Sequence, residues 1–291
     1  MFTLLLGQAE KSQPFILILD DAHRLTEARS RFEVALADAL REAQGSGIPF
    51  HVVLAGRAGS MPKVGLDFPI TAPKTQIHVG PLPLRAAAPH LPGNAAYEKI
   101  RAYGVFGGYP GVLTHLDTKV TVGTNVRRLL LPDTGPLGDL PMTWLETAIQ
   151  TPTRYIAVLE SLSQGEAGWS QLSKAIPDLT KAGQIAPYLK KLSELGLIHA
   201  HRSLDTRPRG RNTRYALFDP FLAFWLRFIL PWRSSERNKE IVPYYASEIR
   251  PRIRDHLQRV MAPVCRRHME IDALETFGSN AREAGAIWNN E

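Results

Sequence analysis

The sequence predicts a mixed protein in which an α/β unit with a parallel sheet precedes a helical region, an α+β region and a mostly helical C-terminal segment. Two apolar runs, at 15–19 and 50–55, flank a segment with helical spacing at 26–44, and this is the pattern of a strand–helix–strand unit. Further along the chain, 154–218 has the pattern of three helices followed by two short strands with a basic loop between them.

The N-terminal unit begins with Phe15–Leu19, an unbroken apolar run whose length and branching are typical of a strand buried on both faces of a parallel sheet. The helix predicted over 26–44 ends at the glycines of 45–47, and the second strand follows at 50–55. Because the links between these elements are short, a parallel crossover is favoured. Residues 76–80 have the composition of a third short strand.

The middle of the chain is predicted to be helical and interrupted. Residues 81–93 are rich in proline and predict a loop with a short turn, and helical segments follow near 94–106 and 110–117. Residues 118–142 carry several glycines and prolines, which indicate a hinge or linker.

The α+β region begins with helices over 143–162, near 169–176 and near 181–195. Two short alternating strands follow at 197–204 and 213–218. Pro187 lies early in the third helix, where an N-terminal turn tolerates it at the cost of a shorter helix.

Two further helices complete the prediction. Residues 219–232 are strongly apolar, with Asp219 well placed as the N-terminal cap, and a helix near 243–267 precedes a weak tail. The predicted domain boundaries are then 1–80, 81–142, 143–240 and 241–291.

Composition sets limits on the class of protein. A single cysteine, Cys265, excludes a disulfide scaffold and any multi-cysteine zinc site. The longest apolar runs are too short to cross a bilayer, and the N-terminal run after Met1 lacks the basic start of a signal peptide, so we expect a cytoplasmic protein.

The positive charge is concentrated in the second half of the chain. The chain has 35 basic and 28 acidic side chains, and residues 151–291 hold 21 of the basic against 15 of the acidic. A basic half favours a polyanionic partner such as nucleic acid, although a solvated basic surface is an equal alternative.

An acidic pair follows the first strand. In open parallel sheets, ligands bind at the carboxyl ends of strands, and nucleotide hydrolases place an acid there. Asp20 fits the acid that holds Mg²⁺, and Asp21 fits a catalytic role in activating the attacking water. Arg57 or Ser60, after the second strand, could sense a nucleotide γ-phosphate. The alternative is a buried strand that ends in a polar turn, beside an ordinary loop.

The phosphate-cradling sequence GxxxxGK[ST] is absent from the chain. Its backbone N–H groups and lysine normally hold the phosphates of the nucleotide. Without that loop, the acidic pair has no phosphate-binding partner nearby in the sequence.

The order of elements over 154–218 matches a winged helix-turn-helix, in which 182–195 is the recognition helix and the two strands form the wing. Apolar positions of this helix repeat on one face. The opposite face and the wing carry the residues that we expect to contact DNA, and these are Gln184, Lys190, Lys191, Arg202, Arg207, Arg209, Arg211 and Arg214. Arginine side chains suit phosphate oxygens. A winged helix that contacts protein is the alternative. Residues 250–267 add six arginines on a predicted amphipathic helix.

Together, FILILDD at 15–21, HVVLAGRAGS at 51–60, GGYP at 107–110 and the winged helix resemble the archaeal-type P-loop ATPases of the AAA+/STAND group. Many of those proteins end in a restriction-endonuclease-like domain. The resemblance implies a partial P-loop ATPase core, a helical lid, ATP and Mg²⁺ as ligands, and a nucleotide-facing role for Gly107, Gly108 and Pro110. It also implies a fragment, because the phosphate-binding loop should precede Met1, and a nuclease-like segment too short to carry its carboxylates.

We therefore expect a DNA-binding winged-helix protein derived from a P-loop ATPase, with an incomplete nucleotide site and no nuclease activity. Two alternatives stay open. One is a protein-interaction module without enzymatic activity, with a protein partner or a second copy of the chain. The other is an ATPase that acts only with a missing N-terminal segment or a partner.

Overall fold

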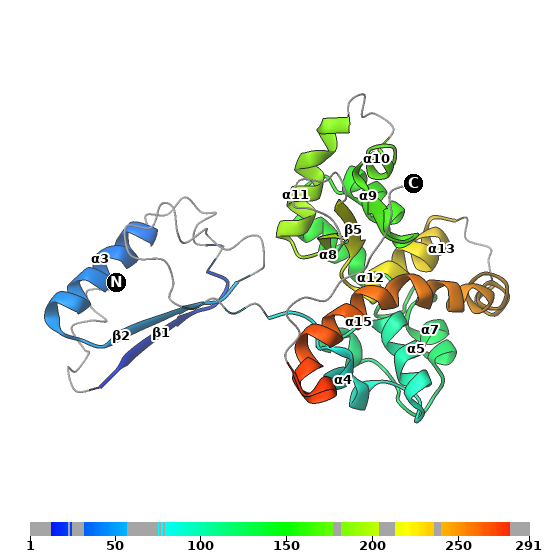
Figure 1. Ribbon diagram of the computed structural model, residues 1–291, viewed down its shortest axis with the longest axis horizontal. Coiled ribbons are helices and arrows are strands. Elements are labelled where there is room, and N and C mark those ends of the chain that lie inside the picture. Colours follow the sequence, from blue (N-terminus) through cyan, green and yellow to red (C-terminus); the bar gives the residue numbers. More distant parts are fainter. Residues whose placement is uncertain are drawn as a thin grey trace. The chain divides into compact units, whose positions relative to one another are not determined.

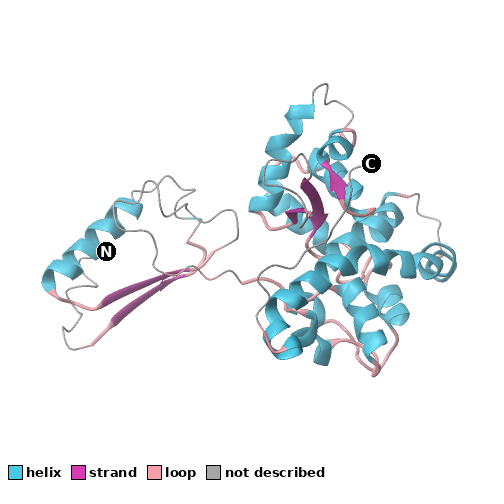
Figure 2. Ribbon diagram, viewed as in Figure 1, coloured by secondary structure: helices cyan, strands magenta, loops and turns pink. Residues whose placement is uncertain are grey.

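A computed structural model describes residues 13–22, 24, 32–56, 75, 77, 79–176, 182–203, 213–235 and 240–279. The chain divides into two compact units, Met1–Val79 and Gly80–Glu291. Figure 1 shows the helices and strands of each unit, and Figure 2 shows that helices predominate in the second. The predicted mixture of a small parallel sheet, an antiparallel sheet and many helices is confirmed.

The first unit contains the predicted strand–helix–strand arrangement. Strand β1 (Phe15–Leu19) pairs in parallel with β2 (Phe50–Leu54), and helix α3 (Phe32–Ser46) connects them. The buried face of α3 packs on alternate side chains of both strands, among them Leu17 and Val52. This small apolar layer is the core of the described part of the unit.

The expectation that β1 is buried on both faces is wrong. The side chains of Ile16 and Ile18 are 58% and 67% exposed, whereas those of Leu17 and Leu19 are partly buried. The reason is that α3 covers one face of the sheet only, so the pleat of the strand leaves every second side chain uncovered. The predicted third strand also fails at its described positions, because Ile77 and Val79 are in no strand and are at least 81% exposed.

The second unit begins with six helical segments. They are α4 (Leu84–Ala87), a 3-10 turn η1 (Ala88–His90), α5 (Ala96–Phe106), α6 (Pro110–Leu113), α7 (Val122–Leu129) and α8 (Leu140–Ala148). The Glu98 carboxylate accepts backbone N–H bonds from Asn94 and Ala95 at the start of α5, which satisfies two donors at the helix terminus. Thr121 caps α7 by accepting from the Thr124 N–H at 3.1 Å.

Residues 118–142 differ from the predicted hinge, because they are fixed to the core. The Trp225 indole donates to the Gly138 carbonyl at 2.6 Å, and the Trp232 indole donates to the Leu131 carbonyl at 2.7 Å. Arg233 donates to the Pro132 carbonyl at 2.8 Å. The glycines and prolines therefore shape turns whose carbonyls are held by distant side chains, and local composition does not reveal those contacts.

The α+β region follows the predicted order of helices and strands. Its elements are α9 (Thr153–Ser163), β3 (Ala167–Gly168), α10 (Trp169–Ser173), η2 (Ala182–Ile185), α11 (Ala186–Glu194), β4 (Ile198–Arg202) and β5 (Thr213–Leu217). The strands form an antiparallel sheet of order β3-β5-β4. The short strand β3 was not predicted, and it extends the predicted pair of strands to three. Pro187 lies in the first turn of α11, so it interrupts no hydrogen bond within the helix.

The C-terminal part is helical throughout its described residues. Its elements are α12 (Pro220–Phe224), a π-helical turn η3 (Trp225–Ile229), α13 (Leu230–Ser234), α14 (Ile241–Tyr244), a second π-helical turn η4 (Tyr245–Ile249), a 3-10 turn η5 (Arg250–Arg252) and α15 (Ile253–Phe277). The predicted cap is confirmed, since Asp219 accepts the N–H groups of Phe221 and Leu222 at 3.1 Å.

One hydrophobic core runs through the second unit. It extends along the sequence from Ala87 to Val264 and centres on the large side chains of α12 and η3, including Phe221 and Trp225. The boundaries predicted near 142 and 240 fall inside the range of this core. Among the described helices, none is both long enough and apolar enough to cross a membrane.

Candidate functional site

The acidic pair lies where the two parallel strands end. Register places Leu19 opposite Leu54, and the Ala55 N–H donates to the Leu19 carbonyl at 2.9 Å. Asp20 and Asp21 are both exposed at this edge. The Asp21 backbone adopts a positive φ of 50°, and its N–H donates to Asp20 Oδ1 at 2.8 Å. A non-glycine residue with a positive φ is uncommon, so the backbone of this turn has an unusual conformation.

The chemistry of the pair fits a hard cation in part. Carboxylate oxygens are suitable Mg²⁺ ligands, and Mg²⁺ often takes one or two of them together with water and phosphate. In the part of the chain that the structure describes, no third acid, histidine or cysteine joins the pair. Arg57 and Ser60, the predicted γ-phosphate sensors, lie outside the described residues.

Gly107 and Gly108 lie in a tight turn between α5 and α6, and Pro110 is the first residue of α6. Gly107 ends α5 with a φ of 63°, and a Cβ at this position would overlap the Asp219 carboxylate. A Cβ at Gly108 would overlap the carbonyl oxygen of Leu82. Both glycines therefore have a packing role in the second unit, whereas the acidic pair belongs to the first unit. The nucleotide-facing role of these three residues stays a prediction.

Helix α11 and the 3-10 turn η2 that leads into it have the two faces that the sequence predicts. Ile185, Leu189 and Leu192 are buried, while Gln184 and Lys190 are exposed and Lys191 is partly buried. Because i, i+4 and i+7 side chains share one side of a helix, the apolar face is used in the core and the polar face is directed away from it. The helix thus presents a basic and polar surface.

The hairpin adds two of the predicted arginines. Arg202 is exposed at the end of β4. Arg214 is partly buried in β5, where it is paired with His201 of β4. Arg207, Arg209 and Arg211 lie outside the described residues. Where the strands are described, the hairpin therefore places a basic side chain on each strand at the end nearest the connecting segment.

A partly buried polar cluster, which sequence reasoning missed, contacts this hairpin. Glu166 precedes β3, and its two carboxylate oxygens contact Arg266 of α15 at 3.1 Å and His201 of β4 at 3.0 Å. Their side chains are only 10–19% exposed. Burial alone would raise the pKa of Glu166, but His201 and Arg266 lower it overall, so the carboxylate stays ionised.

The sequence carries a signal for one residue of this cluster, His201. His199 and His201 are two positions apart in β4 and therefore share one face of the strand, where their rings lie 5.6 Å apart. Burial and the neighbouring charges of His201 and Arg266 lower the pKa of His199 to about 4, so it is neutral at physiological pH. The contact with Arg266 joins positions about 100 residues apart in the sequence, and periodicity carries no information on such pairs.

Most arginines of 250–267 contact carboxylates or backbone carbonyls of the second unit. Arg252 pairs with Glu248, Arg259 pairs with Asp255, and Arg267 donates to the Pro81 carbonyl at 3.1 Å. The predicted basic face of this helix is therefore partly neutralised by neighbouring acids and carbonyls.

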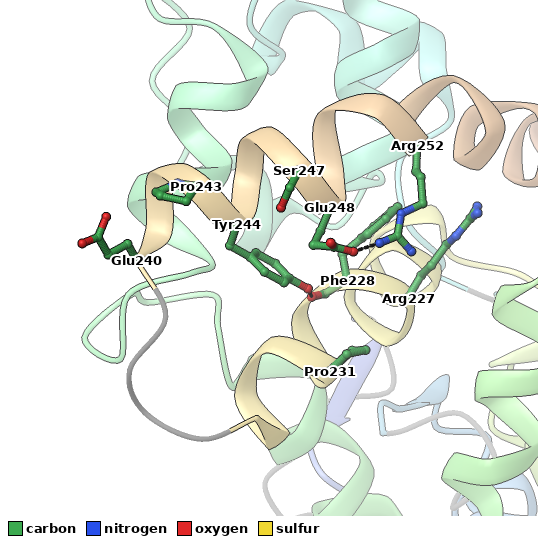
Figure 3. Close-up of a pocket in the computed structure, with 9 residues that line it drawn as sticks. All are labelled: Arg227, Phe228, Pro231, Glu240, Pro243, Tyr244, Ser247, Glu248 and Arg252. Carbon is green, nitrogen blue, oxygen red and sulfur yellow. Dashed lines mark hydrogen bonds and ion pairs between the residues drawn. The ribbon is translucent and has the colours of Figure 1, made fainter.

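An open cavity of about 430 Å³ lies between the two π-helical turns. Figure 3 shows Phe228 and Arg227 from η3 on one side, and Glu248 from η4 with Arg252 from η5 on the other. The Cζ atoms of both arginines lie within 6 Å of the Phe228 ring centre. Two arginines and two glutamates, Glu240 and Glu248, line the cavity, so the formal charges of its lining are balanced. Arg252 pairs with Glu248, and Arg227 pairs with Asp255, which lies outside the lining.

Two ionisable side chains, Asp219 and His256, are buried in the hydrophobic core of the second unit. Burial raises the pKa of Asp219 to about 7 despite its two backbone hydrogen bonds. His256 is fully buried between the rings of Phe224 and Phe228, and its Nε2 lies 2.8 Å from the Gly104 carbonyl. Because a carbonyl only accepts, Nε2 carries the proton in this arrangement.

No known family model matches the chain. Over 82 residues it is 28% identical to Uncharacterized protein MJECL04 of Methanocaldococcus jannaschii. The matched segment is 28% of this chain and 18% of that protein, so the match spans a small part of the relative's length. At this identity and coverage the similarity shows no family.

Proposed function

We propose that residues 153–217 form a winged helix-turn-helix that binds duplex DNA. The observation that carries the proposal is the combination of α11, with its apolar side in the core and its polar side exposed, and the β4–β5 hairpin with its arginines. In this class of fold the recognition helix enters the major groove and the wing contacts the backbone. The element order helix, strand, two helices and two strands supports that assignment.

The physical basis of the proposed affinity is electrostatic. Arg202 and Arg214 flank a connecting segment that contains Arg207, Arg209 and Arg211, with Asp205 as the acidic residue between them. Each cation that neutralises a phosphate releases condensed counterions. The logarithm of the binding constant therefore falls linearly with the logarithm of the salt concentration, with a slope of about 0.9 per phosphate contact. The proposal therefore predicts strongly salt-dependent binding with limited sequence preference.

The test is fluorescence anisotropy of the full chain with a labelled random-sequence duplex over a salt series. Lys190→Glu should weaken binding and reduce the salt slope, by about one unit for a lost phosphate contact. Lys119→Glu is the matched control, because this exposed lysine precedes α7, at the opposite end of the second unit from α11 in Figure 1. Reversal of Arg207, Arg209 and Arg211 together should abolish most of the affinity. Unchanged binding in that triple variant contradicts the wing assignment.

Nucleotide binding is a second candidate function, in line with ancestry from a P-loop ATPase. It is favoured by the exposed Asp20 at the carboxyl end of β1 in a parallel pair. The experiment measures binding of Mg²⁺–ATP by calorimetry in the full chain and in Asp20→Asn. Asp38→Asn, an exposed acid on α3, is the control. Equal ATP affinity in wild type and Asp20→Asn contradicts the metal role of Asp20.

A protein partner is the third possibility, and the uncovered face of β1 and β2 favours it. Ile16, Ile18 and Val53 are each at least 49% exposed on this face. Apolar sheet faces of this kind usually pack against another element. A stable complex without nucleic acid, whether with another protein or between two copies of the chain, would favour this alternative in size-exclusion chromatography with light scattering.

A further inference from the structure

The partly buried cluster of Glu166, His201 and Arg266 joins three segments that are separate in the sequence. Glu166 directly precedes β3, His201 lies in β4, and Arg266 lies near the middle of α15. Glu166 Oε1 accepts from Arg266 Nη2 at 3.1 Å, and Glu166 Oε2 lies 3.0 Å from His201 Nε2. One carboxylate thus ties the last long helix to the sheet through both of its oxygens.

A second contact between α15 and the hairpin lies beside this cluster. The Arg267 guanidinium is 5.0 Å from the centre of the Phe218 ring, and Phe218 directly follows β5. The His199 ring meets the Phe218 ring edge to face at 6.0 Å and also contacts His201. Consecutive arginines of α15 therefore hold both strands of the hairpin, one through Glu166 and the other through Phe218.

The cluster lies close to the basic residues of the hairpin along the strands. His201 is paired in register with Arg214, and the next pair toward the connecting segment is Arg202 with Thr213. The cluster therefore fixes the hairpin at the same level as its basic residues. Because the Glu166–Arg266 ion pair is partly buried, removing one partner leaves the other charge poorly solvated, and this favours the arrangement in which the two are paired.

We propose that Glu166 and Arg266 are positioning residues for DNA binding, through which α15 holds the β4–β5 hairpin in the orientation that presents its arginines to the phosphate backbone. This inference rests on the proposed DNA-binding function of the second unit. Neither residue needs to touch DNA, because Glu166 repels phosphate and the Arg266 side chain is only 12% exposed. Their effect reaches DNA through the order of the hairpin.

The Glu166→Gln substitution separates this idea from simple electrostatics. It removes a negative charge near the proposed surface, so a purely electrostatic role predicts tighter DNA binding. Positioning predicts weaker binding, by roughly tenfold, because a looser hairpin must be ordered when DNA binds. The salt slope should stay unchanged, because the same phosphate contacts form in the complex. Glu160→Gln makes the same chemical change at an exposed position of α9 and is the matched control.

The experiment combines two measurements on the full chain. Amide hydrogen exchange of β4 and β5 without DNA should be faster in Glu166→Gln and Arg266→Ala than in wild type and Glu160→Gln. Anisotropy with the random-sequence duplex should then show the loss of affinity in the same two variants, and Arg266→Lys, which keeps the charge, should recover part of it. Should Glu166→Gln fail to fold, Arg266→Lys carries both measurements, with smaller changes in the same directions.

Unchanged exchange in the hairpin, tighter DNA binding by Glu166→Gln, or a reduced salt slope in Arg266→Ala each overturns the inference. Failure of the wild-type chain to bind the duplex has a different meaning. It would remove the proposed function, whereas the exchange data would still decide whether α15 orders the hairpin through Glu166.

Discussion

The buried His256 makes the second unit sensitive to acid, and the size of the effect follows from its surroundings. With Nε2–H directed at the Gly104 carbonyl, Nδ1 is a buried acceptor that has no hydrogen-bond partner among the described residues. Protonation would place a second N–H and a positive charge between two phenylalanine rings. Burial therefore lowers the pKa of His256 from 6.5 to about 4, and the hydrogen bond to Gly104 opposes this only in part.

The pKa shift of His256 makes the free energy of unfolding depend on pH. Since the folded pKa lies below the unfolded one, the stability is fully present above pH 6.5 and is lost as the pH falls toward 4. The shift is equivalent to about 3 kcal/mol at full protonation, and roughly 2.5 kcal/mol of it is already lost near pH ~4.5. This is a large share of the stability of an ordinary domain.

The perturbation is His256→Gln, which keeps an amide donor for Gly104 and carries no titratable proton. We expect the variant to be less stable than wild type at neutral pH and to gain about 2.5 kcal/mol relative to it near pH ~4.5. Urea unfolding followed by tryptophan fluorescence measures both, since every tryptophan of the sequence follows residue 80. His90→Gln, at an exposed position, is the control. A difference between wild type and His256→Gln that stays constant with pH would refute the reasoning.

Three further predictions concern the same core. Asp219→Asn should become more stable relative to wild type as the pH rises from about 4 to 8, by up to about 4 kcal/mol, because the raised pKa of about 7 costs folding free energy above the unfolded value of 3.8; a series of urea melts checks this. Gly108→Ala should destabilise by about 1–3 kcal/mol or more because its methyl group meets a backbone carbonyl, whereas Gly111→Ala, with open space around it, should be neutral or slightly stabilising in thermal unfolding. Trp225→Phe should cost about 1–3 kcal/mol in the same assay, because the buried Gly138 carbonyl loses its donor; an unchanged melting temperature would contradict that role.

Local patterns predicted the elements well because their causes are local. The parallel pair β1 and β2 follows from two apolar runs and a helix of suitable length between them, and the Asp219 cap follows from its place before an apolar helix. The apolar side of α11 follows from periodicity alone. The residues that decide the cap and the apolar side of α11 lie within about one or two turns of each other, and those that decide the parallel pair lie within one strand–helix–strand unit.

The features that the sequence did not reveal depend on distant partners. Whether Ile18 is buried depends on what covers the second face of the sheet, and strand composition does not say. Residues 118–142 have the composition of a linker, but Trp225 and Trp232 hold their carbonyls from about 90–100 residues away. The candidate site divides in the same way: the basic face of α11 was predictable, and the contact of Glu166 with Arg266 was not.

The single core of the second unit limits how this protein can be taken apart. A fragment that ended at 240 would lose α15, which supplies Leu257, Val260 and Val264 to buried positions and Arg266 to the hairpin. A fragment that began at 143 would leave the indoles of Trp225 and Trp232 without their acceptors. The proposed DNA-binding portion is consequently not a transferable module: gene fusion, recombination or crystallisation trials would have to carry all of 80–279 to keep it intact.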